Sequence, residues 1–153
     1  MVSGAQDIED VLAASRGLLG VVARTIAPAL EHVTVPQFRL IVLVAALGPT
    51  RSSDLAQRLA VSVSTLTRNV DRLVAGGWVR RRANSSSKRE VLVEATEHGR
   101  ALVDEVTRRR RRELETVLAG LSDDDRSKVV EGSRVLRTAL DEPLLEDVSG
   151  FGG

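Results

Sequence analysis

Residues 51–94 restrict the fold more than any other part of the chain. They carry two short runs of apolar residues at helical spacing, joined by Ala60-Val61-Ser62. A serine is expected to cap each predicted helix, Ser52 the first and Ser62 or Ser64 the second. Two helices joined by about three or four residues form a helix-turn-helix, whose second helix fits the major groove of DNA.

The second predicted helix presents short polar side chains and one long cation opposite its apolar positions. Hydroxyl groups can contact base edges or phosphates, and arginine pairs bidentately with guanine. An ordinary solvated helix face would have the same pattern, so this helix alone leaves both interpretations open. The candidates for DNA contact on and beside it are Ser62, Ser64, Thr65, Thr67 and Arg68.

A basic β-hairpin is predicted directly after Gly76-Gly77, which ends the second helix. Trp78–Arg82 and Val91–Val93 are its strand candidates, and the turn between them carries two cations. A hairpin behind a helix-turn-helix is a wing, whose arginine-bearing tip can enter the minor groove. The wing therefore favours DNA binding over an ordinary polar face. Its candidates for DNA contact are Arg80, Arg82, Lys88 and Arg89.

Four further helices are expected to flank this region. Pro28 should end or kink the first of them, and the second should be the most deeply buried because it is apolar on most sides. Thr50-Arg51 allows no more than a single bridging strand pair. The fold class is therefore mainly α with a small β-wing. The four helices are predicted from Asp7 to about Ile26, from Val35 to Leu47, from a cap at Thr96 to Ala119, and from Ser122 to Pro143.

The first, the fifth and the last helix of the chain each carry a long apolar stripe that one winged lobe cannot cover. A second copy of the chain would cover these stripes, which predicts a two-fold homodimer, whereas a monomeric helical bundle is the alternative. The predicted organisation places dimerisation helices at 1–33 and 96–143 around a winged helix-turn-helix lobe at 34–95. Residues 144–153 are expected to form a disordered tail.

Charge is unevenly distributed along the chain, although the formal net charge is only +1. Residues 50–100 contain ten Lys or Arg and five Asp or Glu, whereas residues 113–147 contain four and ten. A basic middle region next to an acidic end suggests that the middle meets a polyanion such as double-stranded DNA.

Composition and motifs exclude several other classes of protein. The chain has no cysteine and two histidines, which argues against disulfides, thiolate chemistry and a zinc site, and no cofactor is expected. No phosphate loop, nucleophile elbow or HExxH motif indicates an enzyme. No uninterrupted apolar run reaches transmembrane length and no secretory n-region is recognised, so a soluble, cytoplasmic protein without a membrane partner is predicted.

The order and spacing of six short motifs resemble the MarR family of bacterial transcriptional regulators. The resemblance implies a triangular obligate dimer with interlocked end helices and one winged lobe per subunit. It also implies an aspartate that orders the wing, a position at which this chain has Ser87. The tip of the wing is therefore expected to be more mobile before DNA binds. The motifs are Thr34–Phe38, Ser53–Leu59, Ser62–Arg68, Asp71–Leu73, Gly77–Arg81 and Thr96–Arg100.

The resemblance further implies a cavity for a small-molecule effector near the first and second helices. His32 lies between these helices, where a surface or capping role is the alternative to a ligand role. Five consecutive arginines, Arg108–Arg112, cannot all face solvent on a helix, so one of them either packs its stem at the dimer seam or binds the carboxylate of an acidic effector. The candidates for effector contact are Arg16, His32, Gln37, Arg109 and Arg110.

The leading functional hypothesis is a sequence-specific repressor that binds a palindromic operator as a homodimer and is released by a small molecule. Two recognition helices must lie about 34 Å apart to enter successive major grooves, and a ligand between lobe and dimer body could change that separation. The alternative is an architectural or anti-repressor protein without an effector. Two phenylalanines, one tryptophan and no tyrosine are a lean supply for an aromatic cavity, which keeps this alternative open.

Overall fold

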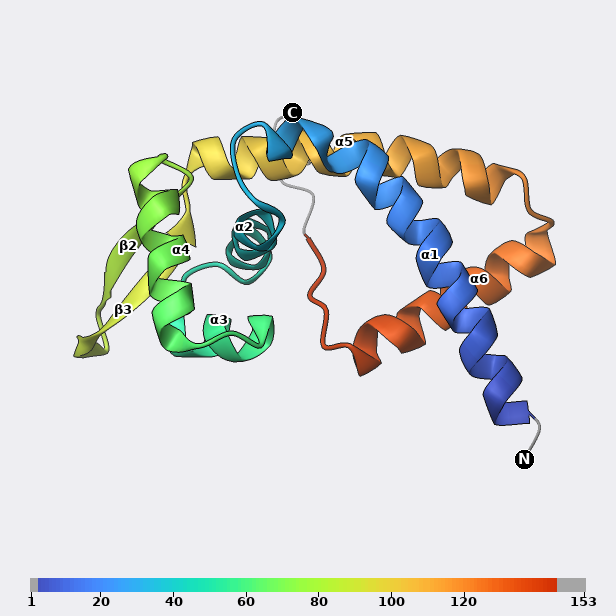
Figure 1. Ribbon diagram of the computed structural model, residues 1–153, viewed down its shortest axis with the longest axis horizontal. Coiled ribbons are helices and arrows are strands. Elements are labelled where there is room, and N and C mark those ends of the chain that lie inside the picture. The colour runs from blue at the N-terminus through green and yellow to red at the C-terminus, as the bar shows by residue number, and fades with distance from the viewer. Residues whose placement is uncertain (1–2, 146–153) are drawn as a thin grey trace.

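The computed structural model describes residues 3–145 and has a helical lobe with a small sheet at one end and a frame of long helices at the other (Figure 1). This confirms the predicted fold class. Residues 146–153 of the predicted tail lie outside the described part, and Leu144 and Leu145 belong to no helix. The elements are α1 (Ser3–Leu30), α2 (Val35–Leu47), β1 (Thr50–Arg51), α3 (Ser52–Leu59), α4 (Val63–Ala75), β2 (Val79–Asn84), β3 (Ser87–Ala95), α5 (Glu97–Ala119) and α6 (Asp123–Ala139).

Helix α2 forms the centre of the lobe and is the most buried helix, as predicted. A capping box fixes its start, because Gln37 N donates to the Thr34 hydroxyl and Thr34 N donates back to the Gln37 side chain at 3.0 Å. Leu40, Ile41 and Val44 are completely buried. They pack in one apolar core with side chains from the end of α1, from α3 and α4, from β2 and β3, and from the start of α5. This core holds the helix-turn-helix and the hairpin as one unit.

The sheet has the strand order β1-β3-β2, and both pairs are antiparallel. Strand β1 is the predicted short bridging strand, and it pairs Thr50 with Val93 and Arg51 with Leu92. The hairpin of β2 and β3 is longer than the sequence indicated, and an irregularity separates Ala83 from Asn84 near its tip. The sheet therefore attaches the hairpin to the core along one end of β3.

Several predicted helix boundaries are wrong. Helix α1 begins at Ser3 instead of Asp7, and α6 ends at Ala139 instead of near Pro143. Helix α1 runs through Pro28 to Leu30 instead of ending near Ile26, because the proline lies in the last turn and removes only one backbone donor there. Packing of the buried Ala29 holds that final turn against the core. Ser52 is the first residue of α3 rather than its cap. The cap position is Arg51, which the sheet holds in an extended conformation and which makes no side-chain capping bond.

The base of the wing is joined to α5 by a close backbone contact. The Thr96 hydroxyl donates to the carbonyl oxygen of Gly77 at 2.5 Å and accepts from the backbone N–H of Gly99 at 3.1 Å, which confirms Thr96 as the cap of α5. Gly99 packs so tightly that an added Cβ would lie 2.1 Å from the carbonyl oxygen of Trp78. The wing and α5 therefore move together.

Helices α1 and α6 leave large apolar side chains exposed, and α6 buries no residue at all. Over the part of the chain that the structure describes, α1 is also the one helix long and apolar enough to cross a membrane by length and composition, from Gly4 to Leu30. The length of uninterrupted apolar runs does not reveal this property of α1, because charged residues divide its apolar sequence. The exposed apolar residues of the two helices include Ile8, Val11, Leu12, Leu18, Leu19, Val129, Val135 and Leu136, and Leu140 directly after α6 is also exposed.

Candidate nucleic-acid interface

Helix α4 is amphipathic, with one face in the core and the other in solvent. Leu66, Val70 and Leu73 are buried, which fixes the orientation of the helix about its axis. Ser62, not Ser64, caps the helix, because its hydroxyl accepts from Thr65 N at 3.1 Å. The turn before it is tight because Ala60 adopts the left-handed conformation, with φ 52°. The second helix of the pair is thereby held rigidly on the first.

The solvent face of α4 carries the predicted polar residues close together at its N-terminal end. The Ser62 hydroxyl lies 3.1 Å from that of Ser64 and donates to that of Thr65 at 3.0 Å. Arg68 is exposed and reaches back to the Thr65 hydroxyl at 3.4 Å. The Thr67 hydroxyl donates to the backbone oxygen of Val63 at 2.9 Å. Arg68 is therefore the long donor of this face, and Thr67 retains only its acceptor capacity.

Arg80 and Arg82 of β2 are tied to a carboxylate within the wing. Arg80 Nε donates to Glu94 Oε1 at 2.6 Å, and Arg82 Nη1 lies 3.6 Å from Glu94 Oε2. The Glu94 side chain is only 10% exposed. The hydrogen bond from Arg80 is the main reason why the pKa of Glu94 lies below its usual value. Both arginine side chains remain more than half exposed, so they can reach phosphate, but in competition with Glu94.

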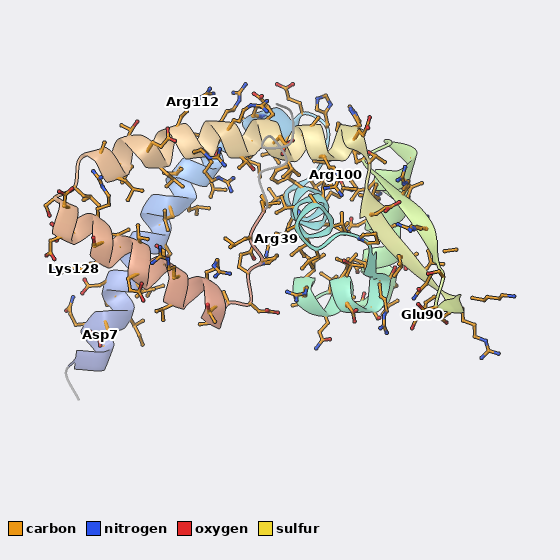
Figure 2. The ribbon with its side chains drawn as sticks, turned by 180° about the vertical axis from the view of Figure 1, so that it is seen from behind. Asp7, Arg39, Glu90, Arg100, Arg112 and Lys128 are labelled. Atoms are coloured by element: carbon orange, nitrogen blue, oxygen red, sulfur yellow. The ribbon has the colours of Figure 1, made fainter. Side chains whose placement is uncertain are left out.

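Lys88 and Arg89 are the exposed cations at the end of the hairpin, near which Figure 2 labels Glu90. Within residues 3–145, neither side chain makes a hydrogen bond or an ion pair. Asn84 organises the tip, because its side chain accepts from Ser86 N at 3.0 Å and donates to Glu90 at 3.1 Å. The sequence interpretation overlooked Asn84, although an asparagine at a turn commonly makes this bond to the backbone two residues later.

The residues predicted for effector contact lie in different local surroundings. Gln37 is used in the capping box of α2, and Arg109 pairs with Glu105 at 2.7 Å. Arg110 Nε donates to the Thr25 hydroxyl at 3.2 Å, and its partial burial lowers the pKa of its guanidinium. Arg110 is thus the arginine of the run that turns inward, whereas Arg16 on α1 is exposed. Their role in binding an effector stays a prediction.

The two histidines both approach Trp78 at the base of the wing. The ring of His98 stacks on the indole with a centroid distance of 4.0 Å, and His32 lies 5.6 Å from it in a tilted arrangement. Both histidines remain exposed to solvent on their other sides. Aromatic contacts of this kind stabilise the junction of the wing with α5.

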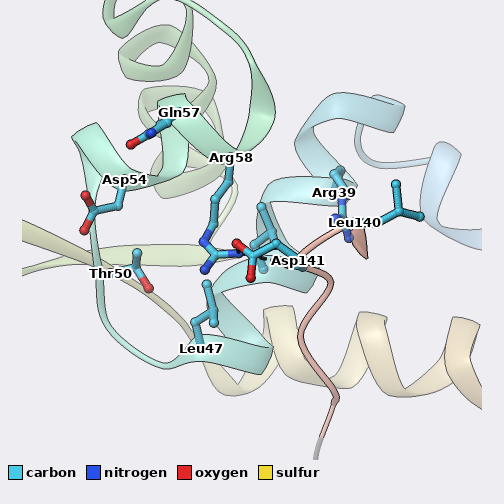
Figure 3. A pocket seen from close by; sticks show the side chains of 9 residues that line it. Arg39, Leu47, Thr50, Asp54, Gln57, Arg58, Leu140 and Asp141 are labelled. Carbon is cyan, nitrogen blue, oxygen red and sulfur yellow. Dashed lines mark hydrogen bonds and ion pairs between the residues drawn. The ribbon is translucent and has the colours of Figure 1, made fainter. Parts of the chain in front are cut away.

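A pocket with a volume of about 580 Å³ lies between the lobe and the end of α6 (Figure 3). None of the five predicted effector residues lines it. Arg58 reaches from α3 toward Asp141 across the pocket, with Arg39 of α2 on another side. The sequence could not indicate this pocket, because residues 39–58 form most of its wall and the end of α6, 83 positions beyond Arg58, forms the rest.

Comparison with known proteins places these features in context. A model of the MarR family matches residues 33–91. The HTH-type transcriptional regulator YfiV of Bacillus subtilis is 28% identical over 113 residues, which cover 74% of this chain and 71% of YfiV. The crystal structure of RV1404 from Mycobacterium tuberculosis is 34% identical with a TM-score of 0.81, and the match covers 91% of this chain and 95% of RV1404.

A third protein shares the fold at lower identity. FabT of Streptococcus pneumoniae, whose crystal structure is in complex with DNA, is 18% identical with a TM-score of 0.71, and the match covers 90% of this chain and 97% of FabT. The matches to RV1404 and FabT extend over the long helices as well as the winged lobe.

Proposed function

The chain belongs to the MarR family of transcriptional regulators, and we propose on this basis that it is a sequence-specific DNA-binding repressor that acts as a homodimer on a palindromic operator. The observation that carries this proposal is the polar group of exposed Ser64 and Arg68 with half-buried Thr65, on a helix whose other face is packed in the core. Such a helix can enter a major groove without losing its packing. The DNA complex of FabT supports the same use of this fold.

We assign separate roles to the two parts of the chain. Residues 34–95 form the DNA-binding lobe, in which Arg68 reads a base edge, Lys88 and Arg89 meet the minor groove, and Ser62, Ser64, Thr65, Thr67, Arg80 and Arg82 contribute polar contacts. Residues 1–33 and 96–143 form the dimer. The exposed apolar side chains of α1 and α6 support this division, because burial of each stabilises by about 1.5–3 kcal/mol.

We propose that a second subunit, rather than lipid, covers α1. The helix carries Arg16 and Arg24 within its long apolar stretch, and Arg24 pairs with Glu113 of α5 at 2.8 Å. Charged residues are costly in the middle of a bilayer, whereas the rim of a protein interface readily contains such a pair. This supports a cytoplasmic location for the protein.

Release of DNA by a small molecule is the remaining part of the proposal. Helix α5 begins at the wing and continues into the frame of long helices (Figure 1), so a change where lobe and frame meet alters the position of the lobe. Repression is relieved only if the ligand binds the DNA-incompetent spacing more tightly than the competent one.

Two measurements test the proposal. Sedimentation at micromolar concentration should give the mass of two chains, and footprinting on the DNA flanking the gene should protect a palindrome. A monomer that binds a palindrome tightly contradicts the dimer. Equal affinity for operator and random DNA, in the presence and absence of any added ligand, instead favours an architectural protein without an effector.

A further inference from the structure

Two arginines from neighbouring helices line the pocket between the lobe and the end of α6. Arg39 comes from α2 and Arg58 from α3, and neither belongs to the face of α4 or to the wing (Figure 3). Leu43, Leu47 and Leu140 contribute apolar walls to the same pocket. The rest of the lining is polar, from Thr50, Asp54, Gln57 and Asp141. A pocket of about 580 Å³ with two arginines and several leucines has the size of a small-molecule site.

Both arginines are engaged by carboxylates from the chain itself. Arg39 holds Glu142 with both Nη atoms, Nη1 at 2.7 Å from Oε1 and Nη2 in contact with Oε2. Arg58 Nη1 lies 2.9 Å from Asp141 Oδ2 and donates to the Asp141 carbonyl oxygen at 3.0 Å. Two adjacent carboxylates that follow α6 thus satisfy two guanidinium groups of the lobe. These contacts connect residues 83 and 103 positions apart in the sequence.

The two carboxylates follow a helix end in which Asp141 adopts a left-handed backbone conformation. Glu142 N donates to Arg137 O and Asp141 N donates to Thr138 O, at 3.1 Å each, which is the Schellman pattern of a helix end. The position that usually takes glycine in this motif is Asp141, with φ 51°. A left-handed non-glycine residue is disfavoured locally, so the pairing with Arg58 helps to hold a conformation that the helix end does not favour alone.

The two ion pairs are exposed enough to be broken. The side chains of Arg39 and Glu142 are 41% and 35% exposed, and those of Arg58 and Asp141 are 31% and 82% exposed. Pairs of this kind contribute little net stability because solvent competes for both partners. A soluble molecule carrying two carboxylates can therefore replace the chain's own groups.

We propose that Arg39 and Arg58 form a binding site for a small dicarboxylate, and that Asp141 and Glu142 occupy this site as an internal ligand when the dicarboxylate is absent. Two separate guanidinium groups select two carboxylates, since each can bind one in the planar bidentate manner. The leucine walls fit the methylene chain between the carboxylates. Monocarboxylates satisfy only one arginine and cannot displace both internal groups.

Binding at this site has a consequence that rests on the proposed function. Replacing Asp141 and Glu142 detaches the end of α6 from α2 and α3, which removes these contacts between the lobe and the C-terminal helix. The lobe is then held mainly through α5. A dicarboxylate thus shifts the range of separations available to the two recognition helices of a dimer.

The test measures binding by calorimetry without DNA, so its result does not depend on the repressor proposal. The probes are succinate, glutarate and adipate, with butyrate as the monocarboxylate, all at matched ionic strength. D141N/E142Q should bind the best dicarboxylate about tenfold more tightly than the unmodified protein. This factor is expected if Asp141 and Glu142 leave the site open in about a tenth of the unmodified molecules. D124N/E131Q removes the same charge from α6 outside the pocket, and should bind like the unmodified protein.

Variants of the two arginines complete the test. Arg39→Gln and Arg58→Gln should each lose at least about tenfold in dicarboxylate affinity, the equivalent of one charge-assisted contact. Arg39→Lys keeps the charge without the bidentate geometry and should show an intermediate affinity, which separates lost binding from lost folding. Equal dissociation constants for the unmodified protein, D141N/E142Q and D124N/E131Q would overturn the proposal, as would the absence of binding in all of them.

A second arm connects the site to DNA. The dicarboxylate should change the operator affinity of the unmodified protein but not that of Arg58→Gln. The comparison requires that both proteins bind the operator without the dicarboxylate. Dicarboxylate binding without any change in operator affinity leaves the site in place and contradicts only its coupling to DNA.

Discussion

Nε of Arg80 lies 2.6 Å from Oε1 of Glu94, its direct partner across the β2–β3 ladder. The same carboxylate also pairs with Arg82. Glu94→Gln should therefore release both arginines for binding to phosphate and raise affinity for random DNA. The slope of log K against log salt should steepen by about 0.9 for each additional phosphate that the protein neutralises. Glu115→Gln, which removes an exposed charge from α5, should leave the slope unchanged. Identical slopes for the two variants would mean that Glu94 does not restrain the arginines.

Acid should weaken the fold through carboxylates that arginines hold in their ionised form. Hydrogen bonds from Arg80, Arg109 and Arg24 are the main reasons why the pKa values of Glu94, Glu105 and Glu113 are lowered. Their contribution to stability is complete above the unfolded value, about 4.3, and is lost as pH falls through the lowered values. The melting temperature should thus stay level toward pH 5 and fall below about pH 4. Glu94→Gln should show a shallower decline in a thermal melt series.

Base reading by α4 depends on Arg68, which points outward beside Thr65. Arg68→Ala should weaken operator binding by about 1–3 kcal/mol and blur preference at one base position in each half-site. Arg72→Ala, at the other end of the same helix, removes an equal charge and should weaken operator and random DNA alike. Competition titrations on single-base operator variants distinguish the two. A uniform loss for Arg68→Ala would make Arg68 a phosphate contact.

The wing tip offers a test of minor-groove reading. Arg89→Ala should cost more affinity on operators with A·T-rich flanks, where the narrow groove has the strongest negative potential, than on G·C-rich ones. Lys88→Ala is the matched control, with a smaller dependence on the flanks. Ser87→Asp should lower non-specific affinity and raise the ratio of specific to non-specific binding, because the acid repels phosphate while ordering the tip. Titrations on matched duplexes measure both effects, and indifference of Arg89→Ala to the flanks would assign the wing to phosphate contact alone.

Gly99 controls how closely α5 approaches the base of the wing. Gly99→Ala places a methyl group 2.1 Å from the Trp78 carbonyl oxygen and should destabilise the protein by about 1–3 kcal/mol through overpacking. Gly132→Ala on α6 meets nothing within 4 Å and should stabilise by about 0.5–1 kcal/mol, as expected for a helix interior. Denaturant unfolding at fixed protein concentration compares them. Equal midpoints for the two variants would contradict the tight contact.

Local signals in the sequence were sufficient for most of the fold. The capping hydroxyls of Ser62, Thr96 and Ser122 each accept from a backbone N–H three residues later, so their roles could be predicted from neighbouring residues alone. The errors at Pro28 and Ser52 arose where packing of a final turn or pairing in a sheet outweighed the local preference. Such effects depend on residues far away in the chain.

The sequence was sufficient to predict which residues belong to the candidate interface. It was not sufficient to predict which of their side chains are already paired within the protein. The polar face of α4 follows from helical periodicity. The engagement of Arg80 and Arg82 by Glu94 requires the register of the hairpin, which the sequence leaves undetermined. The pairing of Arg39 with Glu142 across 103 positions depends on how α6 returns to the lobe, and no local pattern reports it.

Strand β2 is an outer strand of the sheet, since β3 lies between it and β1. Its open edge could pair with another chain, yet three consecutive arginines, Arg80–Arg82, occupy it. Charged side chains along such an edge discourage strand addition and fibrous aggregation. The same residues thus protect a concentrated or newly made protein from self-association through its wing. Variants that replace these arginines with uncharged residues should therefore be tested for solubility as well as for DNA affinity.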